Sequence, residues 1–529
     1  MQNSKRLWIA TLIMGIAFDF LFWKKAPGIS FAIYVGLCLI AGFLLLRLEG
    51  FRPARRSLWL LLPIIFFSVM TFVREEPLTL LLNHAFTLFL LALLALTYLG
   101  GRWLAYSMSD YVSGFFHLAG SMLSRPFGFI IERRRIDKEA GKEASGRQVW
   151  TILRGLLIAL PVVVIFAALL SSADLIFAQR LDDFVTLFRL ERLPEYLFRG
   201  AYILVGAYML AGIFLHAASQ SLDNSLHGME KPLFAPFLGF TETAIVLGSV
   251  ILLFLTFVVI QFQYFFGGQT NITLEGYTYS EYARRGFGEL VTVAFSSLLL
   301  FLGLSTITRR INTWQQKAFS GTGIGLVVLI LVMLVSAYQR LVLYEAVYGF
   351  SRLRTYPHVF MIWLGALLVA VVLLEVLRRQ RSFANAALLA AIGFTVSLNL
   401  LNVDAFIVHQ NVNRASDGDV LDVQYLASLS ADAVPILAKE YRSITIPSDV
   451  RDQVGAVLAC RMATQDEQTN QYQSWQSFHH SRWNAERVMQ KVKIYLSHYQ
   501  SNKDDSGLLK VVSPAGMEYQ CWEYGYMDR

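Results

Sequence analysis

Several polar and charged side chains that could bind a ligand or move a proton lie where long apolar stretches end. Asn399 and Asn402 close the last apolar stretch, and Asp404 follows them directly. Their i, i+3 spacing places the two asparagines on one face of a helix. Charge at membrane depth is costly unless it is paired or hydrated, so charged residues there predict a functional site. We therefore predict a hydrated polar cavity with these candidate lining residues: Arg285, Arg340, Glu345, Asn399, Asn402 and Asp404.

The same residues would also suit a structural ion-pair network. Glu281 and Arg285 are four residues apart and can pair along one helical face, and Arg340 and Glu345 share one stretch that leaves an apolar segment. Such a network would lock helices together and orient the chain that follows. Residue types alone do not distinguish a cavity from a network, so both interpretations stay open at this point.

The usual catalytic and metal-binding signatures are absent from the sequence. It contains no HExxH zinc pair, no phosphate-binding GxxxxGK[ST] loop and no GxSxG nucleophile elbow. His479 and His480 are adjacent, and adjacent side chains on a helix point in different directions. We therefore predict no metal site and no cofactor, and we assign no catalytic residue.

Composition places the chain among membrane proteins. Of its 529 residues 55% are hydrophobic and only 16% are charged, against roughly a quarter charged in soluble proteins. The net charge of +8 indicates the lysine and arginine excess that sets membrane topology, and does not indicate nucleic-acid binding. About 20 apolar residues in a helix cross the hydrocarbon layer. Eleven stretches are predicted to do so: 7–23, 29–46, 58–73, 78–99, 152–170, 197–217, 240–266, 290–307, 321–338, 359–377 and 383–401.

The predicted fold is all-α: a polytopic transmembrane helix bundle of about eleven spans over residues 1–414, followed by a small, mainly helical soluble domain over 415–529. With the N-terminus in the cytoplasm, the arginine-rich connections face the cytoplasm, as the positive-inside rule requires. They are 47–56, 102–154, 309–317 and 378–381. Because an odd number of spans separates the two ends, we expect the soluble domain outside the cytoplasm.

The longest internal connection, 100–150, is basic and contains a candidate interfacial helix. Its stretch 111–123 places apolar residues broadly on one helical face, but it is too short to cross a membrane. In the soluble domain we expect several helices, with caps at Asp417 or Asp419 and at Ser448, and a hairpin that turns at 514–516. Cys460 and Cys521 form either a disulfide, if the domain is extracytoplasmic, or two buried thiols.

Six stretches of the chain carry a resemblance to a known family. LNVDAFIVHQNVNR, followed by DVQYLASLSADAVPIL, resembles a bacterial membrane family named domain of unknown function 4173. Four others fit it: FDFLFWKKAPGISF, RGLLIALPVVVIFAALLSSADLIFA, YSEYARRGFGELV with the preceding FTETAIVLG, and YQRLVLYEAVYGFSRLR. The resemblance covers nearly the whole chain. It implies an integral membrane protein and supplies no established activity or functional residue.

Three function classes fit these observations. We favour a membrane sensor or assembly protein of the bacterial cytoplasmic (inner) membrane, with an outer polar cavity and a tail, 415–529, that binds an extracytoplasmic protein. The first alternative is a transferase that acts on a lipid-linked substrate at the outer leaflet, with a carboxylate as base and arginines on phosphates. The second is a transporter of an anionic or lipid-like solute. Expected partners are membrane lipids and that extracytoplasmic protein, with no nucleic acid.

Overall fold

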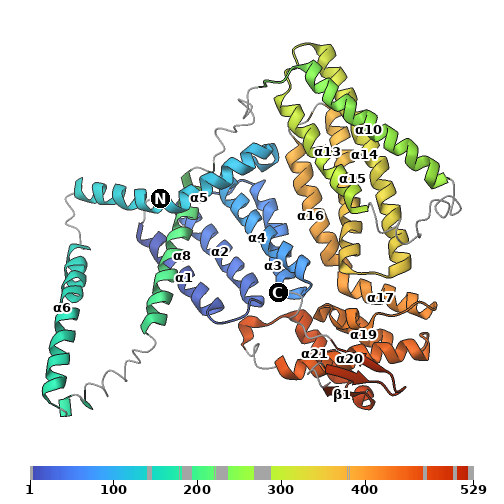
Figure 1. The fold of residues 1–529 in the computed structure, drawn as a ribbon. Coiled ribbons are helices and arrows are strands. Elements are labelled where there is room, and N and C mark those ends of the chain that lie inside the picture. The colour runs from blue at the N-terminus through green and yellow to red at the C-terminus, as the bar shows by residue number, and fades with distance from the viewer. Residues whose placement is uncertain are drawn as a thin grey trace.

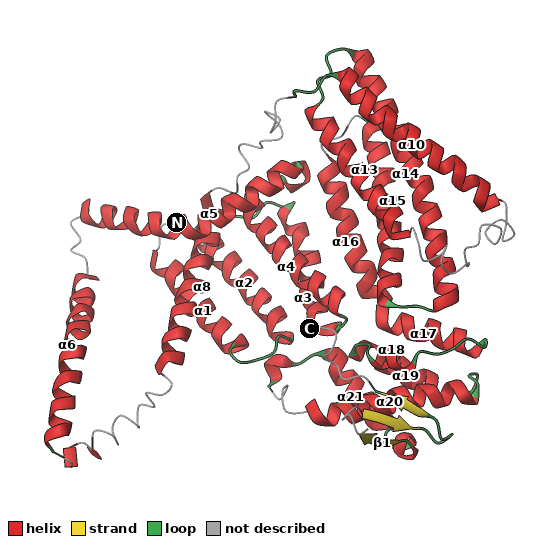
Figure 2. Cartoon of the chain, in the orientation of Figure 1, coloured by secondary structure: helices red, strands yellow, loops and turns green. Residues whose placement is uncertain are grey.

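The computed structural model describes residues 4–139, 146–174, 176–177, 179–180, 193–219, 221, 236–266, 287–377, 379, 382–468, 474–503 and 509–521. Over these residues the chain is an all-α, polytopic helix bundle joined to a small domain that contains three short strands (Figure 2). The predicted fold class is confirmed.

Two groups of helices form the bundle (Figure 1). The first group contains α1 (Ser4–Phe22), α2 (Ile29–Leu48), η1 (Ser57–Leu60), α3 (Leu61–Val73), α4 (Pro77–Thr97), η2 (Trp103–Ala105), α5 (Met108–Glu139) and α8 (Leu193–Ser219). The second contains α10 (Phe240–Phe266), α13 (Phe287–Ile307), α14 (Thr313–Tyr348), α15 (Arg352–Val376) and α16 (Phe383–Leu401). Helix α16 joins the groups, because it packs against both α15 and α4. Helix α6 (Gly146–Ala173) stands apart from both in Figure 1.

Large apolar side chains cover the outside of the bundle as well as its core. On α2, for example, Ile40 is 59% exposed and Leu44 is 57% exposed, whereas Val35 is buried. Helices suit a lipid environment because they satisfy all their own backbone hydrogen bonds, and lipid accepts the apolar side chains outside. The protein is therefore a multi-pass integral membrane protein.

Among the described residues, eight helices are long and apolar enough to cross a membrane: α2, α4, α8, α10, α13, α14, α15 and α16. The other three predicted spans fall on helices α1, α3 and α6, which are not among these eight. Helix α1 carries Lys5, Arg6 and Asp19, α3 has 13 residues, and α6 has Arg147 and Arg154 ahead of the apolar stretch Pro161–Ala173. The count of eleven spans therefore stays a prediction.

Helix α5 lies across one end of the first helix group (Figure 1). It has 32 residues and is much longer than the predicted interfacial stretch 111–123. The predicted stretch stops at 123, but the helix continues through Pro126 and the apolar residues Phe127, Phe129, Ile130 and Ile131 to Glu139. Tyr111 and Leu118 are buried, whereas Phe116 is 74% exposed.

The tail domain, which we define as residues 403–521, lies at the opposite end of the bundle (Figure 1). Its elements are α17 (Val403–Ser416), α18 (Val423–Ala427), η5 (Ala431–Ala433), α19 (Val434–Tyr441), α20 (Ser448–Gln468), η6 (Trp475–Ser477), α21 (His480–Val492), η7 (Tyr495–His498), β1 (Gln500–Lys503), β2 (Leu509–Val512) and β3 (Glu518–Gln520). Helix α17 packs on α19, and Ile407 and Val412 belong to the same core as Leu437 and Val457.

Strands β2 and β3 form the predicted hairpin, and Ser513 N–H donates to Met517 O across its turn at 2.9 Å. Strand β1 adds antiparallel to β2, and sequence analysis missed it because all four of its residues are exposed and show no alternation. Asp422, rather than Asp417 or Asp419, caps α18 by accepting from Tyr425 N–H. A Cys460–Cys521 disulfide ties α20 to the chain after β3, with the Cα atoms 5.3 Å apart.

Candidate functional site

Several bundle segments contact the tail domain, and we call this end of the molecule the tail end. They include 28–29, 74–76, 349–352 and the break at Asn402. The two backbones approach each other closely at Gly28. Ile29 N–H donates to Phe478 O at 2.9 Å, and a Cβ on Gly28 would lie only 2.6 Å from that oxygen. Glycine is required here because no side chain fits between the two backbones.

The break between α16 and α17 directs Asp404 into the protein. Asn402 lies in the left-handed region with φ of 52°, a conformation that asparagine tolerates better than most residues. Its N–H donates to Leu398 O and its carbonyl accepts from Phe406 N–H, so the break ends α16 and begins α17 at one residue. Asp404 therefore sits in the first turn of α17 and is fully buried.

Both carboxylate oxygens of Asp404 are bound by protein groups. Arg352 donates from Nε to Oδ1 at 2.7 Å and from Nη2 to Oδ2 at 2.6 Å, a bidentate geometry that gives strong hydrogen bonds. Ser430 N–H donates to Oδ2 at 2.7 Å, and Arg352 N–H donates to the Tyr425 hydroxyl at 2.8 Å. One carboxylate thus joins α17, the start of α15 and the 425–430 segment of the tail domain.

A second set of contacts crosses the same boundary at the turn between α3 and α4. Asp432 accepts from Glu75 N–H at 2.7 Å and from Glu76 N–H at 3.1 Å. In the opposite direction, Glu75 accepts from Ala431 N–H at 3.1 Å and from the Arg482 guanidinium. Each side of the boundary therefore caps backbone N–H groups of the other, which holds the turn against the tail domain.

Besides Asp404, the titratable side chains of Asp432 and His479 are buried at this boundary. Burial raises the pKa of Asp432 above its ordinary value, although hydrogen bonds from Ser481 and Glu75 act in the opposite direction. Burial lowers the pKa of His479 from 6.5 to about 4, because the charged imidazolium is poorly solvated there. His479 is 5% exposed and lies against the backbone of Thr71 and Arg74. It is therefore neutral at pH 7.

Asn399 bonds to protein groups on α4 rather than to open space. Its side-chain amide and that of Asn83 donate to each other, at 2.8 and 3.0 Å, and it also donates to Thr395 O at 2.9 Å. Arg74 Nε donates to Asn399 O at 2.9 Å. These contacts fix α16 to α4 and so connect the two helix groups next to the tail end.

Glu345 forms a separate buried pair within the second helix group. Its Oε2 lies 3.1 Å from His358 Nδ1, and its side chain is 2% exposed. Among the described residues, Glu345 Oε1 and His358 Nε2 have no hydrogen-bond partner. Arg340 lies on α14 nearer to the middle of the helix. Arg285 lies outside the described residues, and so does its expected partner Glu281.

The structure brings three of the six candidate residues together at the α16–α17 break: Asn399, Asn402 and Asp404. Glu345 and Asp404 have different partners on α15, His358 and Arg352. The contacts of Asn399 and Asp404 have the form expected of a structural network, because protein groups occupy their polar atoms. The cavity interpretation is left with Glu345 and Asn402, because Glu345 Oε1 and Asn402 Oδ1 lack a hydrogen-bond partner in the described part of the chain.

The six candidate residues do not include several residues that complete the boundary, namely Glu75, Arg352, Ser430, Asp432 and His479. A signal for some of them was present. Glu75 and Glu76 lie in a turn of only three residues between two apolar helices. Charged side chains close to apolar helices need a polar partner, and so short a turn has to find it elsewhere in the chain. Nothing in the sequence identified Asp432 as that partner.

Comparison with known families assigns the chain to one of them. Residues 61–440 match the family described as Domain of unknown function (DUF4153), so the chain belongs to this family. The family number suggested by the motifs, 4173, is not the one matched. The matched region extends from the start of α3 into α19 and includes both sides of the boundary at Asp404 and Asp432. No curated protein and no solved structure matches the chain.

Proposed function

Taking membership of this family of unknown function as the premise, we propose that the protein is a sensor or assembly protein of the bacterial inner membrane. In this proposal the tail domain lies outside the cytoplasm and binds a protein partner. Partner binding changes the conformation of the bundle, and this change reaches the end formed by α5. The N-terminus lies in the cytoplasm. The observation that carries the proposal is the buried Asp404–Arg352 pair, because a tail domain held by it cannot shift without moving the start of α15.

Exposed apolar side chains on the tail domain support a protein partner. Ile444 is 93% exposed, Ile494 is 79% exposed and the adjacent Tyr495 is 59% exposed. The Tyr441 hydroxyl lies 3.4 Å from Tyr495 O and brings the 441–444 segment towards η7. Apolar side chains that gather on the surface of a soluble domain are typical of protein interaction sites.

The arrangement of the connections supports the proposed orientation. Arginine-rich segment 52–56 lies at the α5 end, where Ala54 N–H donates to Tyr98 O at 2.7 Å and Trp103 Nε1 donates to Arg56 O at 3.0 Å. The tail domain is at the other end (Figure 1). Positive connections are retained in the cytoplasm during insertion, which favours an extracytoplasmic tail.

Orientation can be tested with two matched cysteines in a Cys38→Ser background. Ile444→Cys is on the tail domain and Arg134→Cys is on α5, and both positions are exposed. A membrane-impermeant maleimide added to intact spheroplasts is expected to label the first variant, and to label the second only after lysis. The reverse pattern would place the tail domain in the cytoplasm and overturn the proposal.

Coupling can be tested with a photo-crosslinking amino acid at position 494 and, as the control, at the exposed polar position 449. One partner protein is expected to crosslink at 494 and not at 449. That partner is expected to change the labelling rate of Arg134→Cys, and Asp404→Asn should abolish the change. A labelling rate at 134 that is the same with and without partner would contradict a sensor.

A further inference from the structure

Helices α5 and α8 form a close seam at the end of the bundle opposite the tail domain. The two helices approach closely at Gly212, where a Cβ would lie 2.5 Å from Met122 Cα, so that a larger residue would separate the helices. Three side-chain contacts flank it: Tyr208 donates to Leu123 O at 2.6 Å, His216 lies 2.8 Å from Ser121 Oγ, and Arg125 donates to Ser219 Oγ at 2.8 Å. The seam fixes the position of Arg125.

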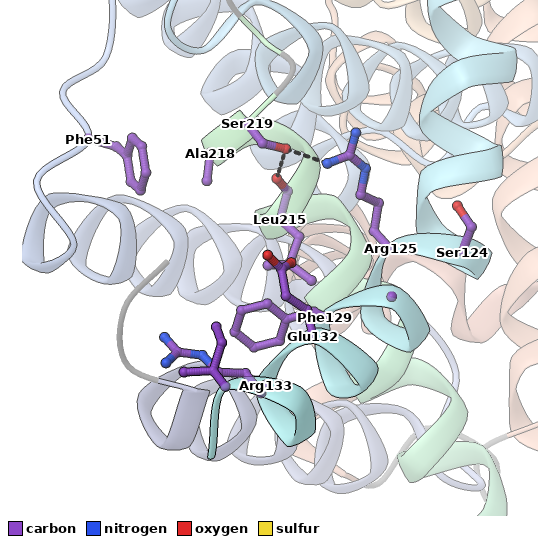
Figure 3. Close-up of a pocket in the computed structure, with 11 residues that line it drawn as sticks. Phe51, Ser124, Arg125, Phe129, Glu132, Arg133, Leu215, Ala218 and Ser219 are labelled. Atoms are coloured by element: carbon purple, nitrogen blue, oxygen red, sulfur yellow. Dashed lines mark hydrogen bonds between the residues drawn. The ribbon is translucent and has the colours of Figure 1, made fainter. Parts of the chain in front are cut away.

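A cavity of about 640 Å³ opens beside this seam (Figure 3). Its walls come from α5, from the last turn of α8 and from Phe51 in the connection after α2. Its apolar lining residues are Phe51, Phe129, Ile136, Leu215 and Ala218. Its polar lining residues are Ser124, Arg125, Glu132, Arg133 and Ser219. The lining therefore offers both apolar and charged groups to a ligand.

The cavity lies where membrane-crossing helices end. The apolar helix α8 ends at Ser219 and α2 ends at Leu48, three residues before Phe51. Next to the cavity, Leu45 and Leu215 belong to one apolar core to which Phe129 of α5 is attached. A ligand bound there would have its polar part at the membrane surface and its apolar part beside the helices.

The charged groups of the cavity suit a phosphodiester. Two arginines and one glutamate give the lining a net charge of +1. An arginine has five N–H donors, and the contact with Ser219 uses one of those on Arg125. Arg133, whose guanidinium carbon lies 5.6 Å from the Phe129 ring centroid, is two helical turns further along α5. Figure 3 shows the Glu132 carboxylate between the two arginines, where it can accept from hydroxyl groups.

We propose that this cavity binds the headgroup of an anionic glycerophospholipid whose headgroup bears hydroxyls, as in phosphatidylglycerol. Arg125 and Arg133 attract the phosphate, Glu132 accepts from the headgroup hydroxyls, and the acyl chains run along the apolar lining residues towards α8. Basic cavities between transmembrane helices are typical sites for anionic headgroups. The site is at the α5 end, so it does not depend on the function proposed for the tail domain.

The test is native mass spectrometry of the purified full-length protein in detergent, titrated separately with phosphatidylglycerol, phosphatidylethanolamine and phosphatidylcholine. We expect one phosphatidylglycerol to bind at least tenfold more tightly than either zwitterionic lipid. Arg125→Gln should weaken that binding by about 10- to 100-fold, because a charge-assisted hydrogen bond contributes about 1.5–3 kcal/mol. Glu132→Gln should weaken it less.

The matched control is Arg134→Gln, which removes the same charge from an exposed position of α5 outside the cavity. It should change binding by less than about twofold. An equal loss in Arg134→Gln and Arg125→Gln would show non-specific attraction and overturn the proposal. So would equal binding of phosphatidylcholine, tighter binding of phosphatidylethanolamine, or displacement by glycerol 3-phosphate at the concentration of the lipid. If Arg125→Gln does not fold, Arg133→Gln replaces it with the same expected loss and the same contradicting results.

Discussion

The two ends of the bundle use charge in opposite ways. At the tail end, Asp404 is fully buried and Arg352 has a 21% exposed side chain, and each carboxylate oxygen has a donor. At the α5 end, Arg135 pairs with Glu139 at 3.1 Å while their side chains are 80% and 66% exposed. Buried pairs are costly to break, whereas exposed pairs contribute little. The comparison indicates that the tail end is built to hold a fixed geometry and the α5 end to meet its surroundings.

Asp404→Asn should produce the largest effect. It leaves the Arg352 guanidinium partly buried without its countercharge, which typically costs about 3–5 kcal/mol. Reversible unfolding in a denaturing detergent would measure the loss. The control is Asp419→Asn. The Asp419 carboxylate lies 3.0 Å from Arg414, and the Asp419 side chain is 53% exposed. It should cost less than about 1 kcal/mol. Equal losses in the two variants would remove the distinction between buried and exposed pairs.

Removing the disulfide with Cys521→Ser should cost about 2–4 kcal/mol, because the bond closes a long loop between residues 61 apart in sequence. The same unfolding assay measures it, with Cys38→Ser as a control that removes a cysteine outside the disulfide. A reduced wild-type protein should match Cys521→Ser. If reduction left the stability unchanged, the disulfide would not contribute to the tail domain.

Acidification should loosen the tail end through His479. Its folded-state pKa is about 4 and its ordinary pKa is 6.5. Its contribution to the free energy of unfolding is therefore fully present above pH 6.5 and is lost as the pH falls through about 4. The loss amounts to up to about 3 kcal/mol. Asp432 acts in the opposite sense, because its raised pKa favours the folded state at low pH. Between pH 7 and 4, the free energy of unfolding should therefore fall more steeply with decreasing pH in the wild type than in His479→Gln. Parallel curves would exclude His479 as the cause.

Glu345→Gln distinguishes a structural pair from a hydrated cavity inside the second helix group. An amide would bury an N–H₂ group next to His358, and a buried donor without an acceptor costs about 1–3 kcal/mol. Loss of that size, measured by thermal unfolding, would favour a structural pair. An unchanged melting temperature would indicate that water or a ligand reaches Glu345.

Arg135→Gln at the α5 end should have the smallest effect. Its pair with Glu139 is an exposed i, i+4 contact, which contributes about 0.2–0.5 kcal/mol. The change in unfolding free energy should lie within the error of the assay used for Asp404→Asn. A loss above about 1 kcal/mol would mean that the α5 end is held as firmly as the tail end.

Some of the candidate site could be predicted from the sequence, because polar residues at the ends of apolar stretches stand out. Asn399 and Asp404 were found in this way. Their partners could not be found, since Asn83 and Arg352 are separated from them by up to 316 residues, and nothing local specifies which helix ends meet. His479 was seen only as one of two adjacent histidines, and its burial depends on the turn between α3 and α4.

The sequence by itself determined the class of the protein, because the length and apolarity of stretches such as Phe383–Leu401 suffice to define membrane-crossing helices. It also determined much of the tail's local structure, such as the hairpin that turns before Met517. Only the tertiary structure decided what the polar residues do. Whether Asp404 lines a cavity or locks two domains depends on which distant groups reach it, and long-range packing sets that arrangement.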